Sequence, residues 1–465
     1  MNTTTGKQAE PSSIEKTHKR ACYDYLFISV IAQIYAFAFF LRSAIAPISD
    51  VLEDDFNATS SEIGLCSSLL FIGYFSMQIP SGMALQVYSP EFISLCCSLL
   101  MGVCAILFAL SPNIEFASVT QLFSGIAQSA TAISILSVSD KRFGSEAVPF
   151  VFGIVKLYCY LSLIAMQYLQ ALIYETYSVW RPVFYFCGGC CLILAAISLF
   201  ALIIESIIDR NRGLDECEST VSSPLNLRCY PLRNWSKRDE YQPVWVSLKR
   251  ALQNPMNYVY SLYAFSMVFV LYGFYGLWLI SYLLLKYGYQ RETATLISPT
   301  FYASMAVSGT VFGYLSKRFQ RRKVFLVLCP VLFASSLIII YAPDSTPALI
   351  ILFCIVAGMG MGGQDPIFWA AVRESNVHCD CENVAVGLVN SVSNSSGFVS
   401  QYLIGLMLDW HWASRGRDED EDGHRIYSVS DYEFGFIAIA VCLVGAVLIS
   451  FVLKETFAKP ADDAK

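Results

Sequence analysis

Twelve apolar stretches, each long enough to cross a lipid bilayer, fall as six plus six around a polar segment at residues 209–254. A hydrocarbon core about 30 Å thick needs about 20 apolar residues of helix. In lipid only a helix or a closed barrel satisfies its own backbone hydrogen bonds, and these runs are continuous rather than alternating, so we predict helices. The predicted spans are 23–49, 62–85, 91–110, 114–138, 147–174, 180–206, 256–286, 293–315, 323–342, 346–372, 385–408 and 430–454.

The placement of charge predicts the orientation of these spans. The chain is 55% hydrophobic and only 15% charged, unlike an ordinary soluble domain. Lysine and arginine gather before span 1 and in alternate loops, whereas the opposite loops carry acids such as Asp50 and Asp344. By the positive-inside rule both termini are predicted to be cytosolic. The basic segments lie at residues 7–20, 141–142, 210–250 and 317–323.

This pattern predicts five parts of the chain and a multi-pass membrane protein that contacts the lipid bilayer. The parts are a cytosolic N-terminal tail at 1–22, a six-helix bundle at 23–208, a cytosolic linker at 209–254, a second six-helix bundle at 255–455 and a cytosolic C-terminal tail at 456–465. Residues 1–20 are polar and do not resemble a cleavable signal peptide.

Two short motifs bear on the membrane in which the protein resides. Asn57-Ala58-Thr59 lies in the first outer loop, so Asn57 is a predicted glycosylation site, typical of a eukaryotic secretory-pathway membrane. Tyr241-Gln242-Pro243-Val244 in the linker fits a Tyr-x-x-apolar endolysosomal sorting signal. We expect a lysosomal or endosomal membrane or the plasma membrane, with an accessory membrane glycoprotein as a candidate partner.

The cysteines predict neither disulfides nor a metal site. Many of the 16 cysteines lie inside apolar spans, where thiols act as small hydrophobic groups. His378, Cys379 and Cys381 cluster in a short loop, but a fourth ligand is not evident. We therefore expect no metal and no cofactor.

An internal repeat relates the two halves. Residues 152–156 of span 5 align with 386–390 of span 11, which places Lys156 opposite Asn390. Gln-Tyr-Leu follows eleven residues later in both halves, at Gln167 and Gln401, and nearly the same offset places Gly125 opposite Gly358. Two matches in the same order favour duplication of a six-helix unit.

Loop motifs resemble those of the major facilitator superfamily. Residues 313–323, GYLSKRFQRRK, are similar to the family's G-x-L-a-D-R-x-G-R-R-K signature between two spans. The first-half counterpart keeps Gly82 but has Gln86 in place of the acid, and Lys317 replaces it in the second half. The resemblance implies an all-helical fold of two pseudo-symmetric six-helix bundles and transport by alternating access. It also implies a gating loop with Gly82, Gly313, Arg318, Arg321 and Arg322.

A narrower resemblance concerns FLRSAIAPI in span 1, GYFSMQIPSG in span 2 and scattered segments of spans 7 to 11. These are similar to the branch of intraphagosomal amino-acid transporters and lysosomal dipeptide carriers. The resemblance implies amino acids or dipeptides as substrates.

Three ionisable residues inside the spans are the main candidates for substrate contact, because buried charge in a membrane is costly and usually marks a pathway. Arg42 in span 1 either snorkels to the outer interface or grips a carboxylate. Lys156 lies about ten residues inside span 5. Asp365, before Pro366, either binds an ammonium, accepts a proton or pairs with Lys156. Further substrate-binding candidates are Tyr35, Trp278, Gln364 and Asn390.

The sequence argues against an enzyme. It contains no GxxxxGK[ST], HExxH or GxSxG motif, and no polar segment is long enough for a catalytic or ATP-binding domain. We expect a secondary-active or facilitative carrier of a small-molecule substrate and no binding to nucleic acid. An organic-anion or sugar carrier of the same superfamily, and a non-transporting sensor or trafficking partner, remain alternatives.

Overall fold

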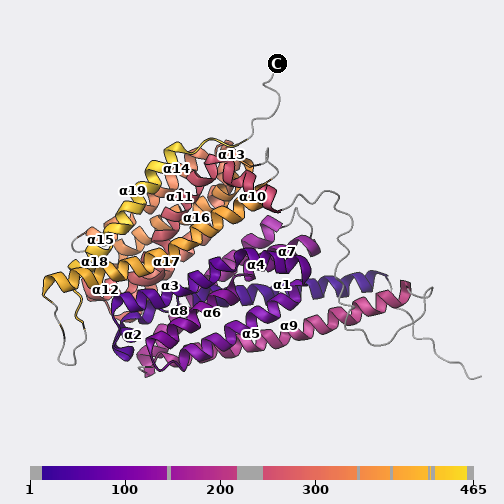
Figure 1. Ribbon diagram of the computed structural model, residues 1–465, viewed down its shortest axis with the longest axis horizontal. Coiled ribbons are helices and arrows are strands. Elements are labelled where there is room, and N and C mark those ends of the chain that lie inside the picture. Colours follow the sequence, from indigo (N-terminus) through magenta and orange to yellow (C-terminus); the bar gives the residue numbers. More distant parts are fainter. Residues whose placement is uncertain are drawn as a thin grey trace, which may run out of the picture.

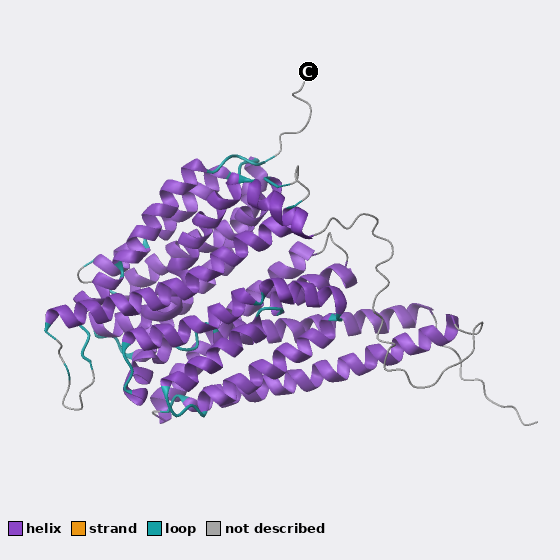
Figure 2. Cartoon of the chain, viewed as in Figure 1, coloured by secondary structure: helices purple, strands orange, loops and turns teal. Residues whose placement is uncertain are grey.

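Helices account for nearly all of the described chain, in the order that the apolar runs predict (Figures 1 and 2). The computed structural model describes residues 13–143, 148–177, 179–216, 244–342, 346–376, 381–416, 419 and 425–457. In the first half the spans are α1 (Ser13–Leu41) with η1 (Ala46–Ile48) and α2 (Ser49–Phe56), α3 (Ser60–Ser76) with α4 (Gln78–Val87), α5 (Pro90–Ala109), α6 (Ile114–Gln128) with α7 (Thr131–Phe143), α8 (Val148–Tyr177) and α9 (Arg181–Glu216).

The second half repeats the arrangement after a short helix, α10 (Val244–Gln253). Helix therefore covers parts of the predicted linker, since α9 also extends beyond residue 208; the domain boundaries stay predictions. The second-half spans are α11 (Pro255–Val270) with η2 (Leu271–Trp278) and α12 (Leu279–Tyr287), α13 (Arg291–Phe319), α14 (Lys323–Phe333) with α15 (Ser336–Tyr341), α16 (Pro347–Glu374), α17 (Glu382–Arg415), and α18 (Val429–Gly435) with α19 (Ile437–Val452).

The helix pairs that pack together follow a pseudo-two-fold symmetry between the two halves. Within the halves, α3 packs on α6, α5 on α9 and α1 on α8, and the corresponding second-half pairs are α13 on α16, α14 on α19 and α11 on α17. Between the halves, α3 packs on α17 and α13 on α8. Exchanging each span for its counterpart six spans later reproduces every one of these pairs. The prediction of two pseudo-symmetric six-helix bundles is thus confirmed.

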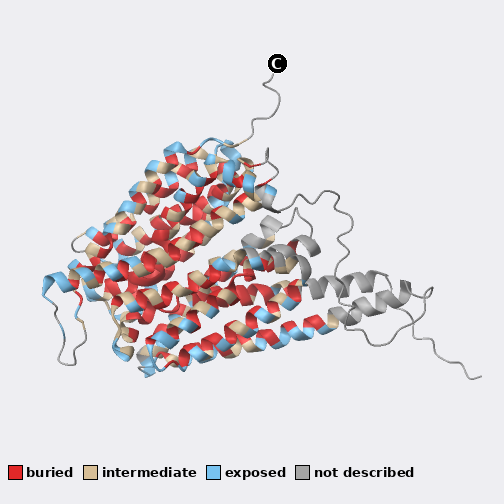
Figure 3. Ribbon diagram, viewed as in Figure 1, coloured by how far each residue is buried: buried red, intermediate tan, exposed pale blue. Residues whose placement is uncertain are grey.

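Eight helical segments of the described chain are long and apolar enough to cross a membrane by length and composition alone. Segments α3, α6, α13 and α17 are not among them. Each packs against helices of its own half, and α3, α13 and α17 also pack against the other half. A helix enclosed by protein has less contact with lipid and tolerates more polar and small residues. Buried residues accordingly gather along the interior of both bundles (Figure 3).

The halves meet at the end of the molecule that bears Asp50 and Asn57, which is called the outer end below. Arg291 at the start of α13 forms an ion pair with Asp50 and donates to the Pro47 carbonyl. The Ser49 and Ser281 hydroxyls lie 2.7 Å apart. Toward α4, α7 and α10 the ribbons of the two halves diverge (Figure 1). The structure is therefore closed at its outer end.

Candidate functional site

The site is built around a break in span 1. Helix α1 ends at Leu41, and Arg42 follows in a turn before the proline-containing η1. The break leaves the Ala44 carbonyl without a helical hydrogen bond, and Gln170 Nε2 of span 5 donates to it at 2.8 Å. A cation next to a helix C-terminus is stabilised by the helix dipole. Broken helices at mid-membrane depth recur at the substrate sites of transporters.

Arg42 is buried rather than snorkelled, with an exposed fraction of 6%. Its Nε donates to Gln128 Oε1 at 3.0 Å, and its guanidinium lies over the rings of Tyr74 at 4.2 Å and Phe39 at 5.2 Å. Its Nη2 is buried and has no hydrogen-bond acceptor among the described residues. A buried donor without a partner is costly, so this nitrogen is available to an anion.

Lys156 lies against the same ring as Arg42. Its Nζ is 4.8 Å from the Phe39 centroid and 5.5 Å from that of Tyr35. The Asp365 carboxylate from the other half interacts electrostatically with this ammonium. The structure therefore brings three of the predicted residues, Arg42, Lys156 and Tyr35, together around Phe39, and a fourth, Asp365, interacts with Lys156. Asp365 also accepts a hydrogen bond from Trp369 Nε1 at 2.9 Å.

The other predicted residues lie further from this cluster or make only local contacts. Gln364 donates to Met361 Sδ, and its Oε1 has no partner within the described chain. Asn390 accepts from Asn394 Nδ2 at 2.9 Å. Trp278 is fully buried in the second half, where its ring faces Tyr432 at 6.2 Å. We therefore place Trp278 outside the cation cluster.

Span 7 is irregular at the place that corresponds to the break in span 1. Residues Leu271–Trp278 form a π-helical turn, η2. Gln167 of span 5 donates to Ser43 Oγ at the break in span 1, and its repeat counterpart Gln401 donates to the Tyr272 carbonyl within this turn. Single π-helical turns are rare and occur frequently at functional sites. Matching interruptions in two repeats of a carrier indicate its binding site.

The partners of Arg42 were not predicted from the sequence. Phe39 is one helical turn before Arg42, a spacing that places both side chains on one face and was a usable signal. Gln128, Tyr74 and Tyr272 reach the site from spans 4, 2 and 7, and their sequence neighbourhoods give no such signal.

The predicted gating loop makes its contacts within the second half. Gly313 and Arg318 belong to α13 and Gly82 to α4, so only Gln320–Arg322 form the connection. Arg322 binds Glu374 with contacts of 2.7 and 3.2 Å. Arg318 and Arg321 are exposed.

Glu455, after the last span, binds the start of α14 beside this loop. Its carboxylate accepts the backbone N–H groups of Arg322 and Lys323 at 2.8 and 3.1 Å. Burial alone would raise the pKa of Glu455, but hydrogen bonds from these N–H groups and from those of Phe457 and Thr456 outweigh it and lower that pKa. Glu455 thus caps the start of α14. The loop signature itself has lost its acid, because Lys317 of α13 stands in that position.

The remaining predicted features lie partly outside the described residues. Asn57 is exposed at the end of α2, in a left-handed conformation with φ of 48°. The exposed amide is compatible with glycosylation, which stays a prediction. His378, Cys379 and the sorting-signal residues 241–243 lie outside the described residues.

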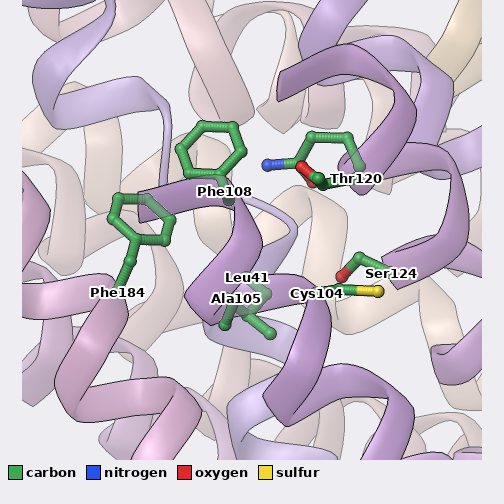
Figure 4. Close-up of a pocket in the computed structure, with 8 residues that line it drawn as sticks. Leu41, Cys104, Ala105, Phe108, Thr120, Ser124 and Phe184 are labelled. Carbon is green, nitrogen blue, oxygen red and sulfur yellow. The ribbon is translucent and has the colours of Figure 1, made fainter. Parts of the chain in front are cut away.

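A small cleft lies inside the first bundle, lined in part by Leu41 and by Ser124, which accepts a hydrogen bond from the Arg42 partner Gln128 (Figure 4). It is too small for an organic solute, and no charged residue lines it. The lining residues are Leu41, Cys104, Ala105, Phe108, Thr120, Gln121, Ser124 and Phe184. Arg42 and Lys156 are therefore the more informative candidates for a binding site.

Comparison with known proteins identifies the family. Residues 31–401, most of the chain, match the Major Facilitator Superfamily. The chain belongs to this superfamily. It is accordingly an integral, multi-pass membrane transporter that works by alternating access, and not an enzyme.

Curated relatives differ from the branch that the sequence resemblance suggested. The chain is 22% identical over 318 residues to sugar phosphate exchanger 3 of Mus musculus, covering 63% of this chain and 62% of the relative. It is 26% identical over 206 residues to the Homo sapiens protein of the same name, covering 39% and 42%. The chain thus spans less than two thirds of the length of these relatives. Their name refers to sugar phosphates and not to amino acids or dipeptides.

Solved structures show the same fold. A bacterial homologue of the human lysosomal transporter Spinster matches with a TM-score of 0.68 at 16% identity, covering 94% of this chain and 99% of that one. The nucleoside transporter NupG matches with a TM-score of 0.65 at 13% identity, covering 92% and 98%. Identities this low show the fold alone.

Proposed function

We propose that the protein transports small organic anions or zwitterions, and that amino acids or short peptides are its substrates. The observation that supports this proposal is the position of Arg42 and Lys156 over one ring, Phe39, with Asp365 interacting electrostatically with Lys156. A planar guanidinium binds a carboxylate through two hydrogen bonds, and Asp365 offers an acceptor for an ammonium group. Two cations and one acid favour a ligand with net negative or balanced charge.

Organic phosphates are the second candidate. The curated relatives are named sugar phosphate exchangers. A pair of cations suits a phosphate at least as well as a carboxylate, because a phosphate carries more charge and more acceptor oxygens. Neutral sugars lack the charge that Arg42 and Lys156 would recognise.

We further propose transport without strict proton coupling. Gln121 takes the place of the arginine that the superfamily pattern has in span 4, and Asp365 is the main deep carboxylate. Because deep groups that could carry a coupled proton are few, we expect facilitated diffusion or exchange. The cytosolic termini, the lysosomal, endosomal or plasma membrane and the accessory glycoprotein remain parts of this proposal.

The test is solute counterflow into proteoliposomes containing the purified full-length protein. The panel comprises amino acids, dipeptides, sugar phosphates and neutral sugars at two pH values. We expect amino acids or dipeptides to exchange and neutral sugars not to. Uptake restricted to sugar phosphates would favour the second candidate, and uptake restricted to neutral sugars would refute both.

Two variants connect this activity to the site. Arg42→Ala and Lys156→Ala should each lower uptake by roughly tenfold or more, because each removes a charge-assisted contact to the solute. Arg373→Ala, at an exposed arginine near the end of α16, is the matched control and should transport normally. Normal uptake by both site variants would remove Arg42 and Lys156 from the pathway.

A further inference from the structure

The cations of the candidate site belong to one half of the molecule. Arg42 follows α1 and Lys156 lies in α8, and the rings beneath them, Phe39 and Tyr74, lie in α1 and α3. A solute shifts a conformational equilibrium only through contacts that differ between the two states. Contacts with the first half alone change little when the halves rock as rigid bodies. Coupling of binding to alternating access needs a second-half group that faces the same anion.

Tyr272 is the second-half residue that the structure places beside Arg42. Among the eight residues of η2, all of them described, Tyr272 alone is half-buried and the other seven are buried. Its ring lies 4.3 Å from that of Phe71 in α3, across the interface between the halves. Tyr272 also interacts electrostatically with the Arg42 guanidinium. The side chain therefore crosses from span 7 into the first half.

The surroundings of Tyr272 hold it in this position. Gln401 Nε2 of α17 donates to the Tyr272 carbonyl at 3.2 Å. Gly273 lies so close to α17 that an added Cβ would come within 2.9 Å of Ser400 Cβ. Because η2 has a π-helical hydrogen-bond pattern, it alters the direction in which its side chains project relative to a regular α-helix.

The internal repeat supports the same assignment. Gln167 of span 5 and Gln401 of span 11 are repeat counterparts. Gln167 Nε2 donates to Ser43 Oγ at 3.5 Å and Gln401 Nε2 to the Tyr272 carbonyl, so Tyr272 lies in span 7 where the break lies in span 1. Phe39 is the ring that Arg42 and Lys156 share. Each half thus supplies an aromatic ring beside Arg42, Phe39 from span 1 and Tyr272 from span 7, and the ring from span 7 bears a hydroxyl group.

We propose that Tyr272 is the second-half residue that positions an anion at Arg42, and that it does so only while the outer end is closed. This inference rests on the proposed anion site. In the empty carrier the hydroxyl oxygen accepts from the guanidinium; with an anion bound, the O–H donates to that anion, since a tyrosine hydroxyl does both. Opening of the outer end withdraws the hydroxyl together with the second half.

The first measurement needs no solute. Spectroscopic labels are introduced by unnatural amino acids at positions 110 and 349, whose leucines are 58% and 39% exposed near the outer ends of the two halves. Tyr272→Phe should lower the ratio of outer-closed to outer-open molecules roughly fivefold, the effect of one hydrogen bond. Tyr263→Phe is the control, because it removes another buried hydroxyl, which donates to the Leu326 carbonyl at 3.1 Å within the second half.

The second measurement is binding of glycylglycine and of glycerol 3-phosphate to the full-length protein. Tyr272→Phe should weaken binding of the probe that the wild type binds by roughly tenfold, and Tyr263→Phe should not. Tyr272→Phe with wild-type distances and wild-type binding would overturn the inference and leave Tyr272 as a packing neighbour of Phe71. Arg42→Ala with wild-type binding would instead refute the anion site itself, and the distance measurement decides the role of Tyr272 even if neither probe binds.

Discussion

At the scale of single residues, the sequence identified the charges of the site but not their surroundings. Arg42, Lys156 and Asp365 could be predicted because each is an ionisable residue within an apolar run, which is costly unless it has a partner or a function. Their neighbours Gln128, Tyr74 and Tyr272 come from other spans, and polar or aromatic residues in membrane helices often serve only in packing. Which of them reaches Arg42 depends on tertiary structure.

Asp365 allows a residue-scale prediction about substrate charge. Asp365→Asn keeps an oxygen that accepts the 2.9 Å hydrogen bond from Trp369, so the fold should be unaffected, but it removes the negative charge beside Lys156. Uptake of a dipeptide should fall roughly tenfold because its ammonium loses a charged partner. Uptake of an organic phosphate should persist or increase.

The same variant tests proton coupling. For a uniporter or exchanger, a pH gradient should not drive accumulation above equilibrium in either wild type or Asp365→Asn. If the wild type accumulates substrate with the gradient and the variant retains only exchange, Asp365 is a proton site. Strictly uncoupled transport would then be wrong.

At the scale of helices, the presence of each helix was easier to predict from the sequence than its breaks and irregular turns. The apolar runs predicted a helix at each of the twelve places, although α3, α6, α13 and α17 are not long and apolar enough to qualify as spans by composition alone. Pro47 lies at the observed break in span 1, whereas α16 continues through Pro366. The π-helical turn of span 7 contains no proline, and its Gly273 packs so closely on α17 that an added Cβ would lie 2.9 Å from Ser400 Cβ.

Glycines at helix crossings give a prediction at this scale. A Cβ on Gly125 of α6 would lie 1.9 Å from the Leu70 carbonyl of α3, so Gly125→Ala must force these helices apart. Overpacking of this kind costs about 1–3 kcal/mol. Gly189→Ala in α9, where a Cβ meets nothing within 4 Å, is the control and should be neutral or stabilising. The midpoint of thermal unfolding in detergent should fall for Gly125→Ala only, and equal midpoints would contradict this crossing.

At the scale of the whole molecule, the repeat predicted two bundles, and packing of α3 on α17 and of α8 on α13 shows how they join. A sequence repeat carries no information about which end of the interface is closed. That depends on contacts between residues far apart in the chain, such as Arg291 with Asp50, whose partnership neither local sequence suggests. The sequence therefore predicts the architecture of the carrier, and the structure adds its conformational state.

Closure of the outer end predicts that locking it stops transport. The Ser49 and Ser281 hydroxyls are 2.7 Å apart and both residues are buried, one in each half, so cysteines at both positions should form a disulfide on oxidation. Alternating access requires these halves to separate at the outer end. The oxidised double variant should lose counterflow and regain it with dithiothreitol.

The wild type and each single cysteine variant, treated with the same oxidant, control for the native cysteines, which are free in the described chain. A disulfide is far stronger than the serine contact that it replaces, so even partial cross-linking should remove a matching fraction of the transport. Full transport by protein with the cross-link verified by mass spectrometry would show that the two halves do not separate between Ser49 and Ser281. The rocking motion would then have to open the carrier elsewhere along the interface between α3 and α17 or between α8 and α13.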